Sequence, residues 1–388
     1  MNKLYNTNEQ ISSCLQNFFK EIDLPLSDYR FELFAELIIS IILAESAVIS
    51  DISKKTFSFN NINDESLHRK IRRFFQSKNF CPYHIFDSII KHVIVNYKIN
   101  HPDKRIHISI DHMFCKDKFV TLMFTLRIGK QGLPLFFRCF KGHNNPDAFD
   151  TDLIIEGIDY VYNLFSNHDY NIIFLADRWF PNVKVFQHID SLNCTYVFRT
   201  KKEHKIKYFD EKEGHHIWKF LSDFSHTKHK TKFLENIDYT ITNPIKTNIV
   251  LGPTSNTDDP WILVTNKNPK RAIKDYSYRF GSIECNFKNN KSNGFYIEAT
   301  KIKNIDSFIG MYLIVNIATI WLTIIGSDYN KNKHHYSNRL KIRDTKKTKN
   351  GSTKRILSLF NLGLTLFNKL YSSIINITIK CNFILYDL

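Results

Sequence analysis

Paired cysteines are missing from the sequence, and this excludes two kinds of cysteine-based scaffold. The seven cysteines are odd in number, scattered along 388 residues and never spaced as CxxC. This distribution argues against a zinc knuckle and against a disulfide framework. It favours a reducing compartment, and the first ten residues carry no apolar run typical of a secretory signal. We therefore expect a cytoplasmic protein.

Long apolar runs are also scarce, with one exception. Residues 308–326 form 19 positions without a charge, long enough to be scored as a membrane span. Because the run contains Asn316 and stands alone in a strongly charged chain, we interpret it as a buried core helix and expect no membrane partner. The alternative is a membrane-associated protein, which predicts that the chain sediments with membranes. No P-loop and no internal repeat is present.

Acidic residues are outnumbered by basic ones. The 54 Lys and Arg stand against 38 Asp and Glu, which gives a formal net charge of +16. Such an excess favours a polyanionic partner, either nucleic acid or an anionic membrane. With 43% hydrophobic residues, the chain is long enough for a substantial core and two or three domains.

The N-terminal hundred residues have helical periodicity. In residues 65–77, four apolar side chains share one face of the expected helix, and the opposite face is basic. A preceding helix would make this pair resemble a helix-turn-helix with a basic second helix. We predict a helical DNA-binding domain over 1–100, contacting DNA through Arg69, Arg72 and Arg73; a solvated basic face on a packing helix is the alternative.

From Arg105 the periodicity changes to two, which indicates strands. The pattern predicts three antiparallel strands and then the order helix, strand, helix, strand; the strands cover 105–111, 119–128, 133–140, 171–177 and 194–199. Asp111 and Asp177 are each placed at the end of a strand. Residues 201–260 are basic and read as an inserted β-rich subdomain that could follow a phosphate backbone. Residues 331–388 read as a basic linker and an apolar C-terminal helix.

Residues 276–295 place Glu284 among several cations. Phe280, Ile283 and Phe287 recur at helical spacing, so we expect a helix that buries these three side chains. In such a helix, Glu284 and Lys291 project along nearly the same line, about 10 Å apart. Lys288 and Lys291 then become candidate phosphate contacts. An ordinary amphipathic helix with solvated charges is the alternative.

Three acids invite a common explanation, because two follow strands and the third lies on this helix. If Asp111, Asp177 and Glu284 converge, they offer the hard oxygen ligands that Mg²⁺ prefers. Two ions about 4 Å apart would support an in-line phosphodiester displacement. We therefore predict a Mg²⁺ site, with Mn²⁺ as a possible substitute.

The sequence around these acids resembles bacterial insertion-sequence transposases of the DDE class, most closely a subgroup with a Tyr-Arg-Glu-Lys signature. The resemblance covers roughly residues 60–370. The matching stretches are SIDHMF at Asp111, LADRWF at Asp177, and the block of Tyr276, Arg279, Glu284 and Lys291 followed by SNGF.

The resemblance implies a mixed α/β protein with an RNase H-like core over 101–200 and 261–330, interrupted by the β-rich insertion. It also implies Mg²⁺-dependent cutting of transposon ends, through a hairpin intermediate in that subgroup, and strand transfer into target DNA. The partners would be duplex DNA and a second copy of the chain in the DNA complex, in the bacterial cytoplasm at the nucleoid. By position, the three acids would be catalytic metal ligands, and Tyr276, Arg279 and Lys291 would contact DNA.

One departure from the family pattern concerns Arg279. The family leaves three residues between this arginine and the glutamate, whereas four separate Arg279 from Glu284 here. In an unbroken helix Arg279 would lie about 140° from Glu284 and point away from it. We predict that the helix is interrupted at Gly281 and Ser282, with Ser282 as an N-cap.

A second function belongs to a different class. A catalytically inactive DNA-binding relative, acting as a transposition inhibitor, would have the same fold and charge. All three acids are present in the sequence, so the residues give this alternative no positive support.

Overall fold

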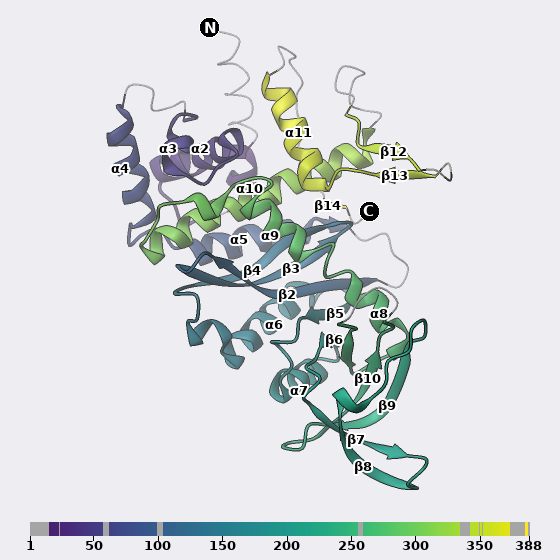
Figure 1. Ribbon diagram of the computed structural model, residues 1–388. Coiled ribbons are helices and arrows are strands. Elements are labelled where there is room, and N and C mark those ends of the chain that lie inside the picture. The colour runs from purple at the N-terminus through teal and green to yellow at the C-terminus, as the bar shows by residue number, and fades with distance from the viewer. Residues whose placement is uncertain are drawn as a thin grey trace.

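A computed structural model gives the fold and describes residues 15–22, 24–56, 62–98, 104–254, 259–333, 342–348, 350, 352–372 and 385–386. The chain is a mixed α/β protein in which helices from both ends of the sequence cover one end of a large sheet (Figure 1).

Helices dominate the N-terminal part, as the periodicity predicted. They are α2 (Asp28–Ala44), α3 (Ile49–Ser53), α4 (Asp64–Phe75) and α5 (Pro82–Val95). In α4 the Asn63 side chain accepts a hydrogen bond from the Ser66 N–H and caps the helix. The apolar face of α4 is buried, and Arg69, Arg72 and Arg73 are exposed. Residues 57–61, within the expected helix-turn-helix, lie outside the described residues, and DNA binding by this part stays a prediction.

The core of the sheet has the order that the sequence predicted. Strands β2 (Arg105–Cys115), β3 (Phe119–Ile128) and β4 (Gln131–Lys141) form an antiparallel meander. After η1 (Pro146–Phe149) come α6 (Thr151–Phe165), β5 (Asn171–Ala176), α7 (Val183–Ser191) and β6 (Thr195–Arg199), with β5 parallel to β2 and to β6. This arrangement is consistent with an RNase H-like core.

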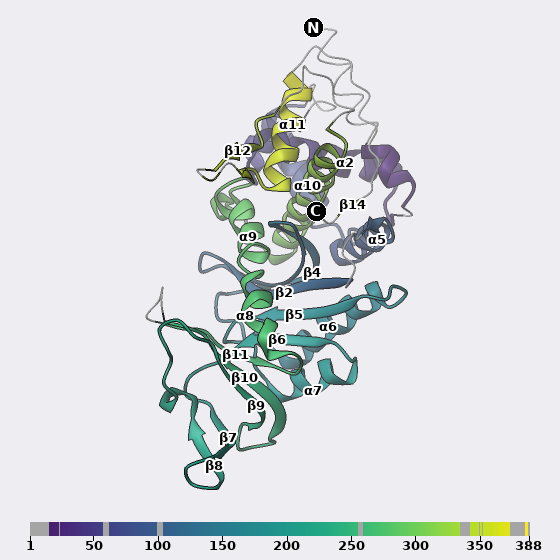
Figure 2. The same ribbon diagram turned by 90° about the vertical axis from the view of Figure 1, so that its right-hand side faces the viewer.

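The insertion is rich in strands, but it is not a separate sheet. It contains β7 (Lys205–Asp210), β8 (His215–Phe220), η2 (Leu221–Asp223), β9 (Lys232–Tyr239) and β10 (Ile245–Leu251), and β11 (Ile262–Thr265) returns to the core. The strand order is β4-β3-β2-β5-β6-β11-β10-β9-β7-β8, so the insertion extends the core sheet to ten strands (Figure 2). The β-rich insertion expected over 201–260 is therefore part of the core sheet, because β10 pairs along β11.

The predicted apolar core helix is present and buried. Helix α10 (Ile305–Lys331) packs among α2, α5, β4 and α11 (Leu359–Ser372). It is the one helix in the described residues long and apolar enough to span a membrane, and 94% of its most apolar stretch is buried inside the protein. Gly326 of α10 and Gly363 of α11 let the two helices touch through their backbones, since a Cβ on either would overlap the facing carbonyl oxygen.

The C-terminal part differs from the predicted linker and helix. Helix α11 matches the expected apolar helix, but β12 (Thr345–Lys347) and β13 (Thr353–Arg355) form a hairpin in the expected linker. The turn is held by hydrogen bonds between Thr348 and Ser352. Strand β14 (Leu385–Tyr386) pairs with β1 (Tyr97–Lys98). Residues 334–341 of the expected linker lie outside the described residues.

Candidate active site

The sheet register brings the two aspartates side by side. Strands β2 and β5 run parallel and pair from Arg105 with Asn171 to Ile110 with Ala176. Asp111 and Asp177 occupy the next position on each chain. Strand β5 ends at Ala176, one residue before the predicted end at Asp177, but β2 continues to Cys115 because its pairing with β3 extends beyond its pairing with β5. The expectation that Asp111 ends its strand was therefore wrong.

The helix expected over residues 276–295 is two helices joined by a turn. Helix α8 (Pro269–Ser277) ends before Arg279, and α9 (Ile283–Lys291) begins after Ser282. The predicted interruption is confirmed, with Ser282 at the N-cap position. Its hydroxyl does not cap α9 but lies 3.1 Å from Thr125 Oγ1 on β3. Arg279 thus stands in a turn, and its direction is not set by either helix.

From this turn, Arg279 reaches two of the three acids. Its Nη2 lies 2.5 Å from Asp111 Oδ2, and its Nη1 lies 3.2 Å from Glu284 Oε1. The guanidinium group is buried, with 5% of the side chain exposed. The extra residue between Arg279 and Glu284 therefore accompanies a turn that brings these two side chains together instead of apart.

Tyr276 adds the third acid to the cluster. Its hydroxyl donates to Asp177 Oδ1 at 3.5 Å, a weak hydrogen bond by distance. Asp177 Oδ1 also accepts from the Arg178 backbone N–H at 2.7 Å. The Tyr276 ring is buried, with its ring centre 5.0 Å from that of Trp261, and burial raises the pKa of its hydroxyl. Its position is that of a carboxylate partner, and a DNA contact by Tyr276 stays a prediction.

The acids influence one another electrostatically. Burial raises the pKa of Asp111 from 3.8 to about 6, against the opposing effects of Arg279 and the His112 N–H. Asp177 and Glu284 raise the pKa of Asp111 further. Burial also raises the pKa of Glu284, with a contribution from Asp177. Three ionised carboxylates around one guanidinium would leave a local charge of about −2 in a partly buried site.

The lysines of α9 have different surroundings. Lys291 Nζ lies 2.9 Å from Glu298 Oε1 in η3 (Ile297–Ala299), and Lys288 is exposed. Phe280 was expected to be buried, but 40% of it is exposed and its ring stacks on Trp261. The prediction failed because Phe280 lies in the turn. The buried face of α9 is formed instead by Ile283 and three amides, which are those of Asn286, Asn289 and Asn290.

A second charged cluster on β2 was missed in the sequence. Asp275 of α8 accepts from Arg105 Nη2 at 2.6 Å, and its other oxygen lies 3.1 Å from His107 Nε2. Arg105 and His107 share the strand face of Asp111, because side chains alternate along a strand. That alternation was visible in the sequence. The acidic partner was not, because it lies 168 residues from His107.

Gly132 is a second missed residue. A Cβ at this position would lie 2.7 Å from the Ser282 carbonyl oxygen, too close for any side chain. The Gly132 carbonyl accepts a hydrogen bond from Asn286 Nδ2 at 3.2 Å. Gly132 lies in β4 and allows the turn before α9 to pack directly on the strand.

The donor set fits Mg²⁺ in chemistry and charge. Three carboxylates supply hard oxygens, and one arginine leaves their charge incompletely balanced. The side chains are not gathered around a preformed site, however. Within the described ranges, no three His, Cys, Asp or Glu side chains lie close enough to hold a metal ion, and Arg279 stands between Asp111 and Glu284. Binding of an ion between these two acids would require Arg279 to move.

Comparisons with known proteins add little to this geometry. No family model and no curated protein matches the chain. Among solved structures, the chain is similar to Marinitoga piezophila Argonaute in complex with a guide RNA and target DNA, at 13% identity and a TM-score of 0.22. The match covers 53% of this chain and 30% of the Argonaute chain. A likeness of this size supports no conclusion about function, which must come from the site itself.

Proposed function

We propose that this protein is a DDE transposase that binds insertion-sequence ends, cuts the DNA by metal-dependent hydrolysis and transfers the strand ends into target DNA. One observation carries the proposal. Asp111 and Glu284 meet at Arg279, and the parallel register sets Asp177 beside Asp111. The sequence resemblance assigns the same three acids to catalysis, and their positions on three separate elements support it.

The charge of the cluster supports a role for Mg²⁺ or Mn²⁺ held by Asp111, Asp177 and Glu284. When bound there, divalent ions would activate the attacking water or 3′-hydroxyl and stabilise the leaving oxygen. Tyr276 restrains Asp177 through its hydroxyl. Arg279 balances part of the negative charge while the carboxylates are unoccupied and could turn toward a DNA phosphate once cations take its place.

Duplex DNA is the proposed partner, both as the element's terminal repeats and as the target. Lys288 is exposed on the same helix as Glu284, and Lys291 follows it one turn later. Arg69, Arg72 and Arg73 offer further positive charge on α4. Joining two transposon ends requires two active sites, so the complex with DNA would be at least a dimer in the bacterial cytoplasm.

The test uses duplexes that carry any inverted repeats found beside the gene. With Mg²⁺ or Mn²⁺, purified protein should cut at the repeat ends, and EDTA should abolish cutting. Glu284→Gln should lower the cutting rate more than about 100-fold and leave end binding intact. Glu298→Gln, which removes a carboxylate on the other side of Lys291, is the matched control and should keep most activity. Undiminished cutting by Glu284→Gln would overturn the proposal.

The second candidate is a DNA-binding relative that does not cut. The bridging position of Arg279 favours it, because a guanidinium between two metal ligands competes with a cation. Wild-type protein that binds the repeats but leaves them intact with both Mg²⁺ and Mn²⁺ would support this candidate and exclude the transposase.

A further inference from the structure

A groove of about 510 Å³ lies between the N-terminal helices and the segment that follows the candidate active site. One wall comes from the start of α3 and from α4, and the other from residues 300–307 at the beginning of α10. The polar side chains that line it are those of Ser50, His68, Arg72, Gln76, Thr300, Lys301, Lys303, Asn304 and Ser307.

The charges of this groove are all of one sign. Arg72, Lys301 and Lys303 line it, and no Asp or Glu is among the lining residues. In the part of the chain that the structure describes, no carboxylate forms an ion pair with any of the three. The His68 ring, which also lines the groove, is held in place by the Ser53 hydroxyl, 2.9 Å from its Nε2. A hollow with three unbalanced cations is suited to an anion with several charges.

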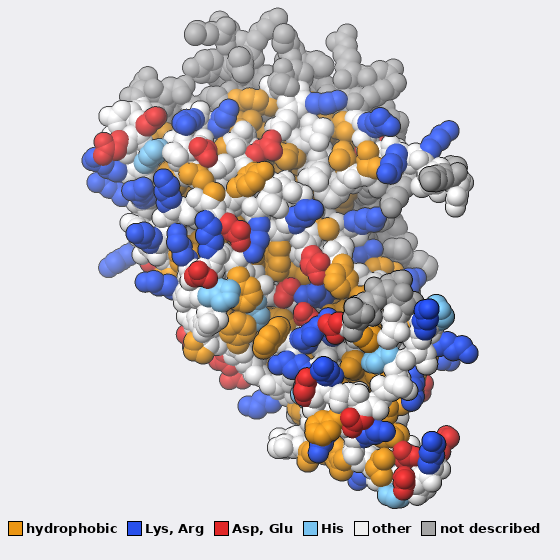
Figure 3. All heavy atoms as spheres, in the orientation of Figure 1, with side chains coloured by type: hydrophobic (Ala, Val, Ile, Leu, Met, Phe, Trp, Pro, Cys, Tyr) orange, Lys and Arg blue, Asp and Glu red, His pale blue; other side chains and the backbone are white. Residues whose placement is uncertain are grey.

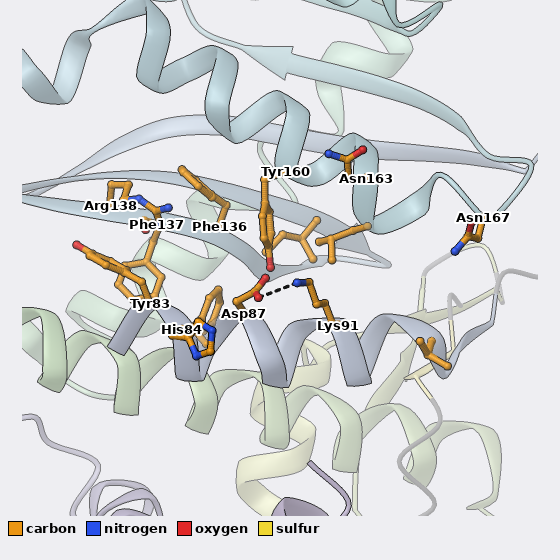
Figure 4. Close-up of a pocket in the computed structure, with 14 residues that line it drawn as sticks. Tyr83, His84, Asp87, Lys91, Phe136, Phe137, Arg138, Tyr160, Asn163 and Asn167 are labelled. Atoms are coloured by element: carbon orange, nitrogen blue, oxygen red, sulfur yellow. Dashed lines mark hydrogen bonds and ion pairs between the residues drawn. The ribbon is translucent and has the colours of Figure 1, made fainter. Parts of the chain in front are cut away.

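A larger cavity shows what an internally balanced hollow looks like. The cavity between α5, β4 and α6 has a volume of about 770 Å³ (Figure 4). Its Lys91 pairs with Asp87 at 2.8 Å, and its Arg138 pairs with Glu156 at 2.6 Å and lies over the Tyr83 ring. Because its cations already have partners, this cavity has no comparable attraction for a polyanion.

The two walls of the basic groove are fixed to each other. Gln76 Nε2 at the end of α4 donates to Ser307 Oγ at 3.2 Å, and the Asn304 side chain caps α10 through the Ser307 N–H. The Phe75 ring of α4 packs against Gly310 of α10 so closely that a Cβ on Gly310 would lie 2.5 Å from that ring. The groove is therefore preformed, which reduces the entropic cost of binding.

The groove is also tied to the candidate active site. Lys301 follows α9 and η3, and the Lys291–Glu298 ion pair joins these two elements. Figure 3 shows Lys and Arg side chains gathered over α4 and the beginning of α10, on the face where acidic side chains lie near α9. An elongated polyanion could thus occupy the groove and extend toward the acids.

We propose that this groove binds the sugar-phosphate backbone of duplex DNA, with Arg72, Lys301 and Lys303 as phosphate contacts. The choice of DNA as the polyanion rests on the proposed function, whereas the preference of the groove for a polyanion follows from its lining residues alone. Arginine can grip a phosphate through two N–H groups, and lysine acts as a point charge. The N-terminal helices and the core then form one continuous DNA-binding surface instead of acting as separate modules.

The test measures binding without metal, in EDTA, by fluorescence anisotropy of a labelled duplex over a series of KCl concentrations. The probes are the flanking repeat, a scrambled DNA duplex and an RNA duplex, all of equal length. Lys301→Gln/Lys303→Gln should weaken binding to both DNA duplexes by about ten-fold. It should also reduce the magnitude of the slope of log K against log [KCl] by about one for each lysine–phosphate interaction that the substitution removes. Arg72→Gln should lower it by about one more.

The matched control is Lys104→Gln/Lys184→Gln, which removes the same charge at the start of β2 and on α7. It should leave the salt dependence unchanged. Unchanged DNA binding by Lys301→Gln/Lys303→Gln would overturn the proposal that the groove binds DNA, even if Mg²⁺-dependent cutting is observed. Weakened duplex binding by this variant, together with no cutting by the wild-type protein, would support DNA binding by the groove and contradict the proposed function. A loss confined to an RNA probe would also overturn the proposal, and equal thermal unfolding of all variants excludes misfolding.

Discussion

Two charged clusters lie on the same face of β2, and they differ in how completely their charges are balanced. In the cluster of Arg105, His107 and Asp275, one carboxylate contacts two basic groups, and only 4% of the Asp275 side chain is exposed. In the cluster around Arg279, one guanidinium contacts both Asp111 and Glu284, and 45% of the Glu284 side chain is exposed. We call these the closed cluster and the open cluster.

The difference shows how one strand can serve stability at one end and chemistry at the other. The closed cluster satisfies its charges within the protein and fixes α8 on the sheet. The open cluster keeps an unbalanced negative charge beside solvent, where a cation can enter. Because α8 leads into the turn that carries Arg279, the closed cluster also positions the open one.

The largest expected difference between the clusters is in stability. Asp275→Asn removes the buried carboxylate that Arg105 and His107 both contact, and it should lower the free energy of unfolding by about 3 kcal/mol. Glu284→Gln changes a half-exposed group and should alter it by less than about 1 kcal/mol. Urea unfolding followed by circular dichroism measures both. Equal destabilisation by the two variants would remove the distinction between a closed and an open cluster.

A smaller effect is expected where the turn between the clusters packs on the sheet. Gly132→Ala places a methyl group against the Ser282 carbonyl, which belongs to a rigid turn, and should cost about 1 to 3 kcal/mol. Gly281→Ala is the control, because a Cβ there meets no atom closer than 3.9 Å. Thermal unfolding compares the two variants. A neutral Gly132→Ala would mean that the turn is not held by this contact.

The smallest effect concerns the pH dependence of the closed cluster. Burial lowers the pKa of His107 below 6.5, although Asp275 opposes the shift. The unfolded chain therefore binds a proton at His107 before the folded chain does, and stability should fall as pH drops below about 6.5. His107→Gln should make this decline shallower between about pH 7.5 and 5.5. Urea midpoints at several pH values measure it, and parallel curves for the two proteins would contradict the assignment.

The periodicity of the sequence was enough to predict most elements near the site. Alternation located β2, apolar runs located β5 and α10, and the additional residue before Glu284 indicated the break that separates α8 from α9. Local signals of this kind are set by side-chain direction and backbone preference, which neighbouring residues determine.

Contacts between distant residues were not predictable in this way. Nothing near Arg105 indicates that its partner is Asp275, and nothing in residues 201–260 indicates that β10 pairs with β11. Phe280 was misplaced because helical counting continued across a turn. Arg279 reaches its two acids from the turn in which Ser282 packs on Gly132, and these last two residues are far apart in the sequence.

The glycine contact between α10 and α11 has a consequence for the order of synthesis. Helix α10 leaves the ribosome before α11, so the face that packs on α11 stays uncovered while the residues up to Ser372 are made. During that interval, a chaperone or the rest of the nascent chain has to shield a segment that would otherwise aggregate. A polypeptide truncated before Leu359 would keep that surface exposed and would be expected to accumulate as insoluble protein.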